Sequence, residues 1–237
     1  MQLTDRIALI TGASRGIGQA VAKRFAAEGA QLILVARTVK GLEETDDAVR
    51  AAGGKATLVQ LDLGDAAAIE ASARMIMTRF GRLDILVGNA GVLGEMTSIA
   101  HSSPEEWNKT LAINLTANMH LIRCFDPLLK QSAQPRALFV TSGISQGVFP
   151  YWNAYAVSKA ALDMMIKLYA AENAKTPLRA NLVSPGQVRT RMHAQAFPGL
   201  DPDTITPSDA ITDIFVTLAG SDVKETGTIF YAQRSGA

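Results

Sequence analysis

The architecture of this chain can be predicted from one run near its amino terminus, Ile7-Ala8-Leu9-Ile10-Thr11-Gly12-Ala13-Ser14-Arg15-Gly16-Ile17-Gly18. Residues 7–10 are an unbroken apolar run, as expected of a strand that helices cover on both faces. Residues 19–28 then show helical apolar spacing, and Gly29 stops that helix. Glycines let the backbone approach a pyrophosphate, and a helix N-terminus offers free N–H groups and a positive dipole end. Strand, glycine turn and helix in this order predict a dinucleotide site.

Strands and helices alternate along the rest of the sequence. Further apolar runs lie at residues 32–35, 56–61, 83–87, 137–140, 178–183 and 228–231. Helical segments are expected between them, over about 42–52, from near 65, over about 104–126 and 153–173, and from 206. With right-handed crossovers, this order predicts an α/β fold: one doubly wound parallel sheet of about seven strands with helices on both faces.

The whole chain, residues 1–237, is expected to form a single domain, since no linker or repeat divides it. Its dinucleotide-binding part should span about 1–135, and its catalytic and substrate-binding part about 136–237. Pro127 should kink or end the helix over 104–126, because proline lacks an N–H donor. The turn-rich residues 191–206 have the profile of a substrate lid.

Composition narrows the class of protein. The 237 residues are 48% hydrophobic and 19% charged, as in globular proteins. Twenty-three basic against 22 acidic side chains give no general attraction to nucleic acid or to anionic membranes. Cys124 is the single cysteine, so no internal disulfide forms, and no cluster of histidines and carboxylates suggests a metal. With no leader-like or long apolar segment, we expect a soluble protein of a reducing compartment, in a bacterium the cytoplasm.

The end of the second strand bears on the choice of cofactor. An NAD-binding unit usually places a carboxylate there to hold the ribose 2′-hydroxyl. This chain has Ala36-Arg37-Thr38 instead, and Arg37 could grip a 2′-phosphate through its fork of donors. Arg15, in the glycine turn, could approach the same phosphate. Together the two arginines favour NADP(H) over NAD(H).

Three polar residues near strand ends or inside a helix each allow two interpretations. Asp62 could accept from the adenine amino group or cap the helix that starts near residue 65. Asn89 lies at the carboxyl end of the fourth strand, where it could contact the cofactor or only tie two loops together. Asn114 lies in an apolar part of a helix, so its amide should either satisfy a backbone group or hold a water.

A second informative stretch runs from Ser142 to Lys159. Tyr155 and Lys159 are four residues apart, so on a helix they share one face. A phenol is a poor acid or base at neutral pH, because its ordinary pKa is about 10. Lowering that pKa to near 7 needs roughly three units, about 4 kcal/mol, which a close ammonium and a cationic cofactor would supply.

These motifs together resemble the short-chain dehydrogenase/reductase family of the classical variety, over nearly the whole chain. The resemblance rests on motifs in family order: Thr11-Gly12-x-x-x-Gly16-x-Gly18, Asn89-Ala90-Gly91, Asn114, Ser142, Tyr155-x-x-x-Lys159 and Pro185-Gly186-x-x-x-Thr190. More narrowly, the carboxyl-terminal segments are similar to a bacterial subgroup of oxidoreductases. The resemblance implies a Rossmann-like fold and hydride transfer between a nicotinamide cofactor and a carbonyl or alcohol.

The resemblance also implies a role for each matched residue. Tyr155 would be the general acid of carbonyl reduction, and Lys159 would lower its pKa and hold the nicotinamide ribose. Ser142 would donate to the substrate oxygen, and Asn114 would hold a water linked to Lys159. The implied cofactor-binding residues are Gly12, Ser14, Arg15, Gly16, Ile17, Gly18, Arg37, Asp62, Leu63, Asn89, Ala90, Gly91, Tyr155, Lys159, Pro185, Gly186, Val188 and Thr190.

Three functions are compatible with this sequence. An NADPH-dependent ketone or aldehyde reductase is favoured, because the tetrad is complete. A non-catalytic NADP(H) sensor would be expected to lack the tyrosine–lysine pair. A 3-oxoacyl-thioester reductase needs a basic docking surface, and residues 121–131 offer only Arg123 and Lys130. By family, the helices over 104–126 and 153–173 would pair the chain into a homodimer or homotetramer. His193, a loop histidine, is not assigned a catalytic role.

Overall fold

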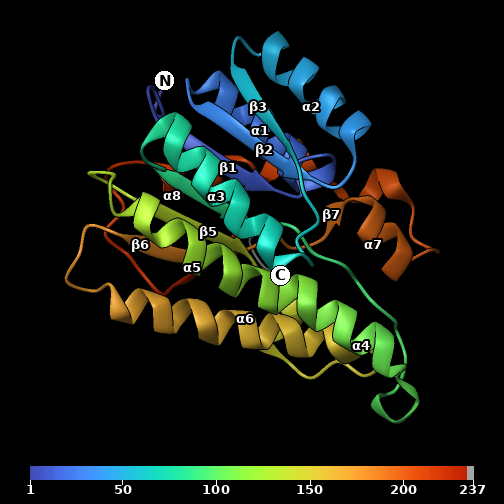
Figure 1. Cartoon of the computed structure of the whole chain (residues 1–237). Coiled ribbons are helices and arrows are strands. Elements are labelled where there is room, and N and C mark those ends of the chain that lie inside the picture. Colours follow the sequence, from blue (N-terminus) through green and yellow to red (C-terminus); the bar gives the residue numbers. More distant parts are fainter. Residues whose placement is uncertain (234–237) are drawn as a thin grey trace.

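A parallel sheet of seven strands forms the centre of the computed structural model, which describes residues 1–233 (Figure 1). Its order is β3-β2-β1-β4-β5-β6-β9, and every neighbouring pair is parallel. The strands are β1 Ile7–Thr11, β2 Gln31–Ala36, β3 Lys55–Gln60, β4 Ile85–Gly88, β5 Arg136–Val140, β6 Arg179–Ser184 and β9 Ile229–Tyr231. The predicted α/β fold with a doubly wound sheet is confirmed.

Helices cover both faces of the sheet. Alternate residues of β1 point to opposite faces: Leu9 to one core cluster, Ala8 and Ile10 to the other. Side chains of α3, α5 and α6 fill the first cluster, and those of α1, α2 and α8 fill the second. The bounds are α1 Gly16–Ala27, α2 Val39–Ala51, α3 Ala66–Phe80, α5 Ala117–Leu129, α6 Asn153–Glu172 and α8 Asp213–Ala219.

The connections create a switch point between β1 and β4. The chain steps outward from β1 through β2 to β3, and then returns to place β4 on the other side of β1. The loops after β1 and β4 therefore leave in opposite directions and open a crevice at the carboxyl ends of the strands. In open α/β sheets this crevice is where ligands bind.

The predicted helix over 104–126 is interrupted and ends later than expected. It consists of α4 Pro104–Leu111, a π-helical turn Ala112–Thr116, and α5. Pro127 lies inside the last turn of α5, so it does not end the helix, which was one of its two expected effects. A proline there removes only the bond to the carbonyl of Arg123, an exposed residue.

The segment after β6 is more regular than its sequence suggested. Residues 191–206 contain a short helix, α7 Arg191–Ala196, and a 3₁₀ turn, Pro202–Thr204. The last helix does not open at residue 206. Instead β8 Thr206–Pro207 pairs with β7 Val188–Arg189, a 3₁₀ turn Ser208–Ile211 follows, and α8 then begins. Two other 3₁₀ turns, Ile99–His101 and Gly143–Gln146, lie in loops at the carboxyl edge. None of the described helices is long and apolar enough to cross a membrane.

Candidate active site

The turn between β1 and α1 is shaped by glycines at positions where a side chain would be strained or would clash. Gly12 and Gly16 have φ of +64° and +58°, in the left-handed region. A Cβ on Gly18 would lie 2.4 Å from the Gly12 carbonyl oxygen and 2.6 Å from Asn89 Nδ2. The backbone of the turn is therefore packed directly against the loop after β4.

Asn89 holds these two loops together. Its Nδ2 donates to the carbonyls of Thr11 and Gly12 at 2.9 and 3.3 Å. In return, Thr11 Oγ1 accepts from the backbone N–H groups of Asn89 and Ala90 at 3.0 and 3.1 Å. The interpretation of Asn89 as a tie between loops is confirmed.

The N-terminus of α1 suits an anionic group. No side chain caps it, and no acidic residue lies in its first turn. Its first N–H groups, at Gly16, Ile17 and Gly18, therefore point toward the crevice with the positive end of the helix dipole. This donor set fits a pyrophosphate.

Arg15 and Arg37 add exposed positive charge beside that terminus. Neither guanidinium forms an ion pair with a carboxylate anywhere in residues 1–233. The start of α2 packs on the glycine turn, since a Cβ on Gly41 would lie 2.8 Å from Ser14 Cβ. Thr45 Oγ1 also donates to the Ala13 carbonyl at 2.9 Å. The segment that carries Arg37 is thus anchored next to the turn that carries Arg15.

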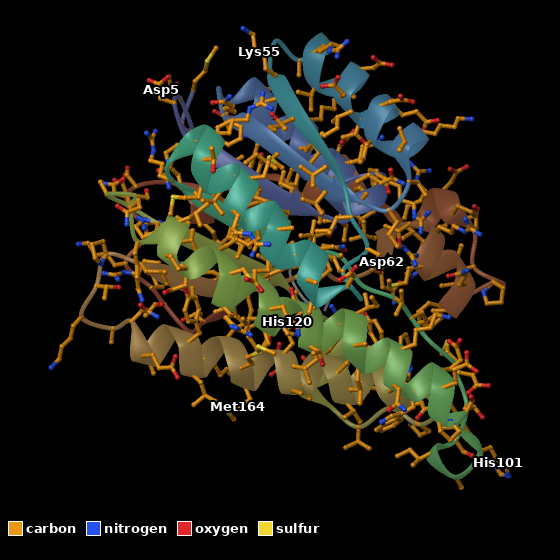
Figure 2. All side chains as sticks on the ribbon, viewed as in Figure 1. Asp5, Lys55, Asp62, His101, His120 and Met164 are labelled. Atoms are coloured by element: carbon orange, nitrogen blue, oxygen red, sulfur yellow. The ribbon has the colours of Figure 1, made fainter. Side chains whose placement is uncertain are left out.

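Asp62 lies where β3 ends, on the side of the sheet that carries the crevice (Figure 2). Its Oδ1 accepts from the N–H of Gly64 at 2.9 Å. The cap of α3 is Asp65, which accepts from Ala68 N at 3.0 Å, so the capping interpretation of Asp62 is wrong. Leu63 beside it is buried.

Tyr155 and Lys159 lie together in the first turns of α6, 8% and 4% exposed. Lys159 Nζ donates to the Val140 carbonyl at 2.8 Å and lies 5.8 Å from the centre of the Tyr155 ring. A Cβ on Gly91 would meet Asn114 Oδ1 at 3.2 Å and Lys159 Nζ at 3.7 Å. The loop after β4 is therefore hydrogen-bonded to the glycine turn through Asn89, and its Gly91 lies beside the lysine.

Burial sets the protonation of this pair. Desolvation raises the pKa of Tyr155 above its usual value, and a hydrogen bond from Ser142 partly offsets the rise. Desolvation also lowers the pKa of Lys159 to about 8. The expected lowering of the Tyr155 pKa required a cationic cofactor as well as Lys159, so it stays a prediction for the cofactor-bound protein.

Asn114 lies in the π-helical turn and is fully buried. Its Oδ1 accepts from Val92 N at 2.8 Å, and its Nδ2 donates to Val92 O and to Ser158 Oγ at 2.9 and 3.0 Å. The amide thus satisfies a neighbouring backbone, the first of the two predicted alternatives. One-turn π segments inside α-helices are frequent at functional sites.

Ser142 caps the 3₁₀ turn after β5, and its Oγ accepts from Ile144 N at 3.3 Å. On the other side of the crevice, Thr190 lies against the glycine turn, because a Cβ on Gly16 would meet its Cγ2 at 3.3 Å. Thr190 Oγ1 also caps α7, accepting from His193 N at 3.1 Å. Pro185, Gly186 and Val188 lie in the same connection, with Gly186 at φ +74°.

Two features of the site were missed from the sequence. Trp152 packs its ring 5.7 Å from that of Tyr155 and 5.8 Å from that of Phe197, which follows α7. The His193 ring lies 5.0 Å from Phe197. The second feature is Asp163, a buried carboxylate one turn beyond Lys159 on α6. Continuing the four-residue spacing from Tyr155 through Lys159 would have found it.

Comparison with known proteins agrees with this geometry. A family model described as short chain dehydrogenase matches residues 6–201. The chain is 34% identical over 236 residues to the uncharacterized oxidoreductase YciK of Escherichia coli K12, covering 98% of this chain and 93% of that one. It is 34% identical over 228 residues to a benzil reductase, IRC24, of Saccharomyces cerevisiae, covering 92% and 86%.

Solved structures give the same result. A short chain dehydrogenase of Shigella flexneri 2a complexed with NADP superimposes with a TM-score of 0.95 at 33% identity, covering 98% of this chain and 99% of that one. One from Escherichia coli CFT073 complexed with NADPH gives a TM-score of 0.95 at 33% identity, covering 98% of each. The chain belongs to the short-chain dehydrogenase/reductase family of NAD(P)-dependent oxidoreductases.

Proposed function

We propose that this protein is an NADPH-dependent carbonyl reductase that converts a ketone or aldehyde to an alcohol with a Ser142–Tyr155–Lys159–Asn114 tetrad. The observation that carries the proposal is the loop after β4. It is hydrogen-bonded to the glycine turn through Asn89, and its Gly91 lies beside the buried Lys159. A cofactor site and a buried phenol–lysine pair are thereby held at fixed separation by one short segment.

The preference for NADP(H) over NAD(H) rests on charge. Arg15 and Arg37 are exposed cations in two segments that pack on each other, and residues 36–38 contain no carboxylate to repel a 2′-phosphate. Two solved relatives bind NADP or NADPH. The other residues proposed to line the cofactor are Gly12, Ser14, Gly16, Ile17, Gly18, Asp62, Leu63, Asn89, Ala90, Gly91, Pro185, Gly186, Val188 and Thr190.

The reduced cofactor, when bound, supplies the hydride. Tyr155 gives its phenolic proton to the carbonyl oxygen as that oxygen gains negative charge. Ser142 donates a hydrogen bond to the same oxygen, which stabilises the charge. The Lys159 ammonium stabilises the phenolate that Tyr155 becomes as it gives up its proton, and the nicotinamide ring, positively charged once the hydride has left, would add to that stabilisation. Asn114 fixes the loop at Val92 and, through an ordered water, would connect Lys159 with solvent.

The wall beside Tyr155 bears on the substrate. Trp152 places an aromatic ring next to the phenol, Phe197 packs on Trp152, and Val148 and Phe149, shortly before Trp152 in the chain, are exposed. Bulky, uncharged carbonyl compounds fit such a wall better than anionic ones. Residues 191–206 would act as the lid over this side, in the catalytic and substrate-binding part, about 136–237, of a single domain.

Oligomerisation is the remaining part of the proposal. Val157, Met164 and Leu168 are exposed by 42–58% and recur on one face of α6. Figure 2 shows Met164 on the side of α6 that points away from the sheet. We propose that this face pairs with a second copy. Met164→Glu should shift sedimentation toward the monomer, and an unchanged profile would contradict the pairing.

The test of the proposed reaction is a turnover assay with the purified protein. Aryl ketones, aliphatic ketones, aldehydes and 3-oxoacyl thioesters are offered with NADPH or NADH, and loss of the reduced cofactor is followed. We expect turnover of uncharged ketones or aldehydes, at least tenfold faster with NADPH at subsaturating cofactor. Turnover of thioesters alone would favour the acyl-thioester alternative. NADPH binding without any turnover would favour the sensor.

A further inference from the structure

A buried carboxylate on α6 lies outside the proposed tetrad. Asp163 is 4% exposed and lies on the same face of the helix as Tyr155 and Lys159, one turn beyond the lysine. Burying an ionised carboxylate is costly unless hydrogen bonds or an opposite charge compensate it. The groups around Asp163 should therefore show what compensates its buried charge.

Three donors surround this carboxylate, and all come from residues 141–146, the segment that leaves β5. Thr141 Oγ1 donates to Oδ1 of Asp163. Ser145 Oγ and Gln146 Nε2 both lie 2.6 Å from Oδ2. Asp163 thus fastens both ends of the segment to α6.

Ser142 lies inside the fastened segment. Its carbonyl accepts from Ser145 N at 3.0 Å, and Ser145 Oγ lies 2.7 Å from the same carbonyl. The single hydroxyl proton of Ser145 can go either to that carbonyl or to Asp163. Since the backbone N–H already satisfies the carbonyl, the hydroxyl is free to bond Asp163. The Ser142 hydroxyl is thereby set against the helix that carries Tyr155.

Asp163 also acts on Lys159 through charge. The groups that face Lys159 Nζ are the Val140 carbonyl from β5, the Asn114 amide from the π-helical turn, and the Tyr155 ring and Asp163 from α6 itself. Among the described residues, Asp163 is the one charged group that raises the lysine pKa against the effect of burial. Without it, the pKa of Lys159 would lie below about 8 and the ammonium would lose its proton nearer to neutral pH.

We infer that Asp163 is a positioning residue for the proposed reduction: it anchors residues 141–146 so that Ser142 faces Tyr155, and it supplies the negative charge opposite Lys159. The role in reduction rests on the proposed function. The effect of Asp163 on Lys159 can be measured in the ligand-free protein without any turnover.

The first experiment titrates Lys159 by NMR in the ligand-free protein labelled at lysine ¹³Cε, with Lys159→Met to assign the signal. In the wild type this signal should titrate near pH 8, apart from exposed lysines at about 10.4. Asp163→Asn, which keeps the shape, should lower the midpoint by roughly one pH unit. Glu172→Gln removes the same charge at the far end of α6 and should leave the midpoint unchanged. An unchanged midpoint in Asp163→Asn overturns the electrostatic role, whether or not the protein is a reductase.

The second experiment measures kcat for ketone reduction against pH. Asp163→Asn should move the alkaline limb to lower pH and reduce the maximal kcat about tenfold, with NADPH affinity within twofold of wild type. A purely structural defect would lower kcat equally at every pH. If Asp163→Asn does not fold, the double variant Ser145→Ala/Gln146→Ala tests the anchor, because both side chains lie nearer the surface. A folded double variant with wild-type kcat would overturn the anchoring role.

Discussion

The two halves of the crevice are built in different ways. On the cofactor side, the loops after β1 and β4 are fixed by backbone contacts, such as the bonds from Asn89 to the carbonyls of Thr11 and Gly12. On the proposed substrate side, the loop after β5 leaves side chains in solvent, with Val148 97% and Tyr151 64% exposed. One half is preformed, whereas the other offers apolar surface that a ligand can cover. A preformed site suits a cofactor that a large family shares. Exposed apolar surface suits a substrate that differs from one member to another.

Lys159→Met removes the cation at the junction of the two halves and should have the largest effect. We expect ketone reduction to fall by about 10³-fold or more, because neither the phenolate of Tyr155 nor the cofactor ribose is held. The same variant should be more stable at pH 7 by about 2 kcal/mol, since a buried charge is removed at the cost of one hydrogen bond to Val140.

The pH dependence of that difference follows from the lysine pKa, about 8 in the folded protein against 10.5 ordinarily. Below pH 8 both folded and unfolded states hold the proton, and the folded state bears the full desolvation cost. Between pH 8 and 10.5 the folded state releases its proton first, so the stability of the wild type rises toward that of Lys159→Met. Urea unfolding at pH 7 and pH 10.5 measures both values. Equal stability of the two proteins at pH 7 would contradict the buried charge.

A pair of glycine substitutions tests the contrast between the halves directly. Gly18→Ala puts a methyl group 2.4 Å from the Gly12 carbonyl oxygen, whereas Gly199→Ala in the proposed lid meets nothing within 4 Å. We expect Gly18→Ala to lose about 3 kcal/mol of stability and to bind NADPH weakly, because the backbone must move. Gly199→Ala should stay within about 0.5 kcal/mol of wild type. Calorimetry measures the stability of both variants, and a fluorescence titration measures their NADPH affinity. Similar losses in the two variants would contradict the difference between the two halves.

Arg37→Ala should affect the cofactor half alone. Removing a charge-assisted contact to a 2′-phosphate should raise KM for NADPH by about 10- to 100-fold and leave KM for NADH nearly unchanged. Arg50→Ala, on the exposed part of α2, is the matched control. Equal effects of Arg37→Ala on both cofactors would mean that Arg37 is a solvated surface residue.

Trp152→Ala should have the smallest effect, and it tests whether this ring selects bulky substrates. Loss of this aromatic ring should raise KM for a bulky aryl ketone several-fold, which corresponds to about 1 kcal/mol of binding free energy. KM for NADPH should not change. KM for acetone-sized ketones should change less than twofold. If small and bulky ketones are affected alike, the ring supports Tyr155 and does not select the substrate.

Much of the cofactor half could be predicted from sequence because its chemistry is local. The glycine turn could be recognised because its glycines directly follow an apolar strand. The start of α6 at residue 153 was predicted from apolar spacing and the preceding loop. Features set by tertiary contacts could not be predicted. The π-helical turn at Asn114 depends on its partner Val92, and α7 depends on the cap from Thr190. The raised pKa of Tyr155 comes from burial, which spacing along a helix cannot reveal.

The proposed reduction requires Tyr155 to be the proton donor. The most direct test is a single-turnover reaction of the NADPH-loaded protein with a saturating aryl ketone, comparing the wild type with Tyr155→Phe. We predict that Tyr155→Phe binds NADPH with wild-type affinity and oxidises it about 10²- to 10⁴-fold more slowly. Oxidation by Tyr155→Phe at a rate close to that of the wild type would contradict the proposed chemistry.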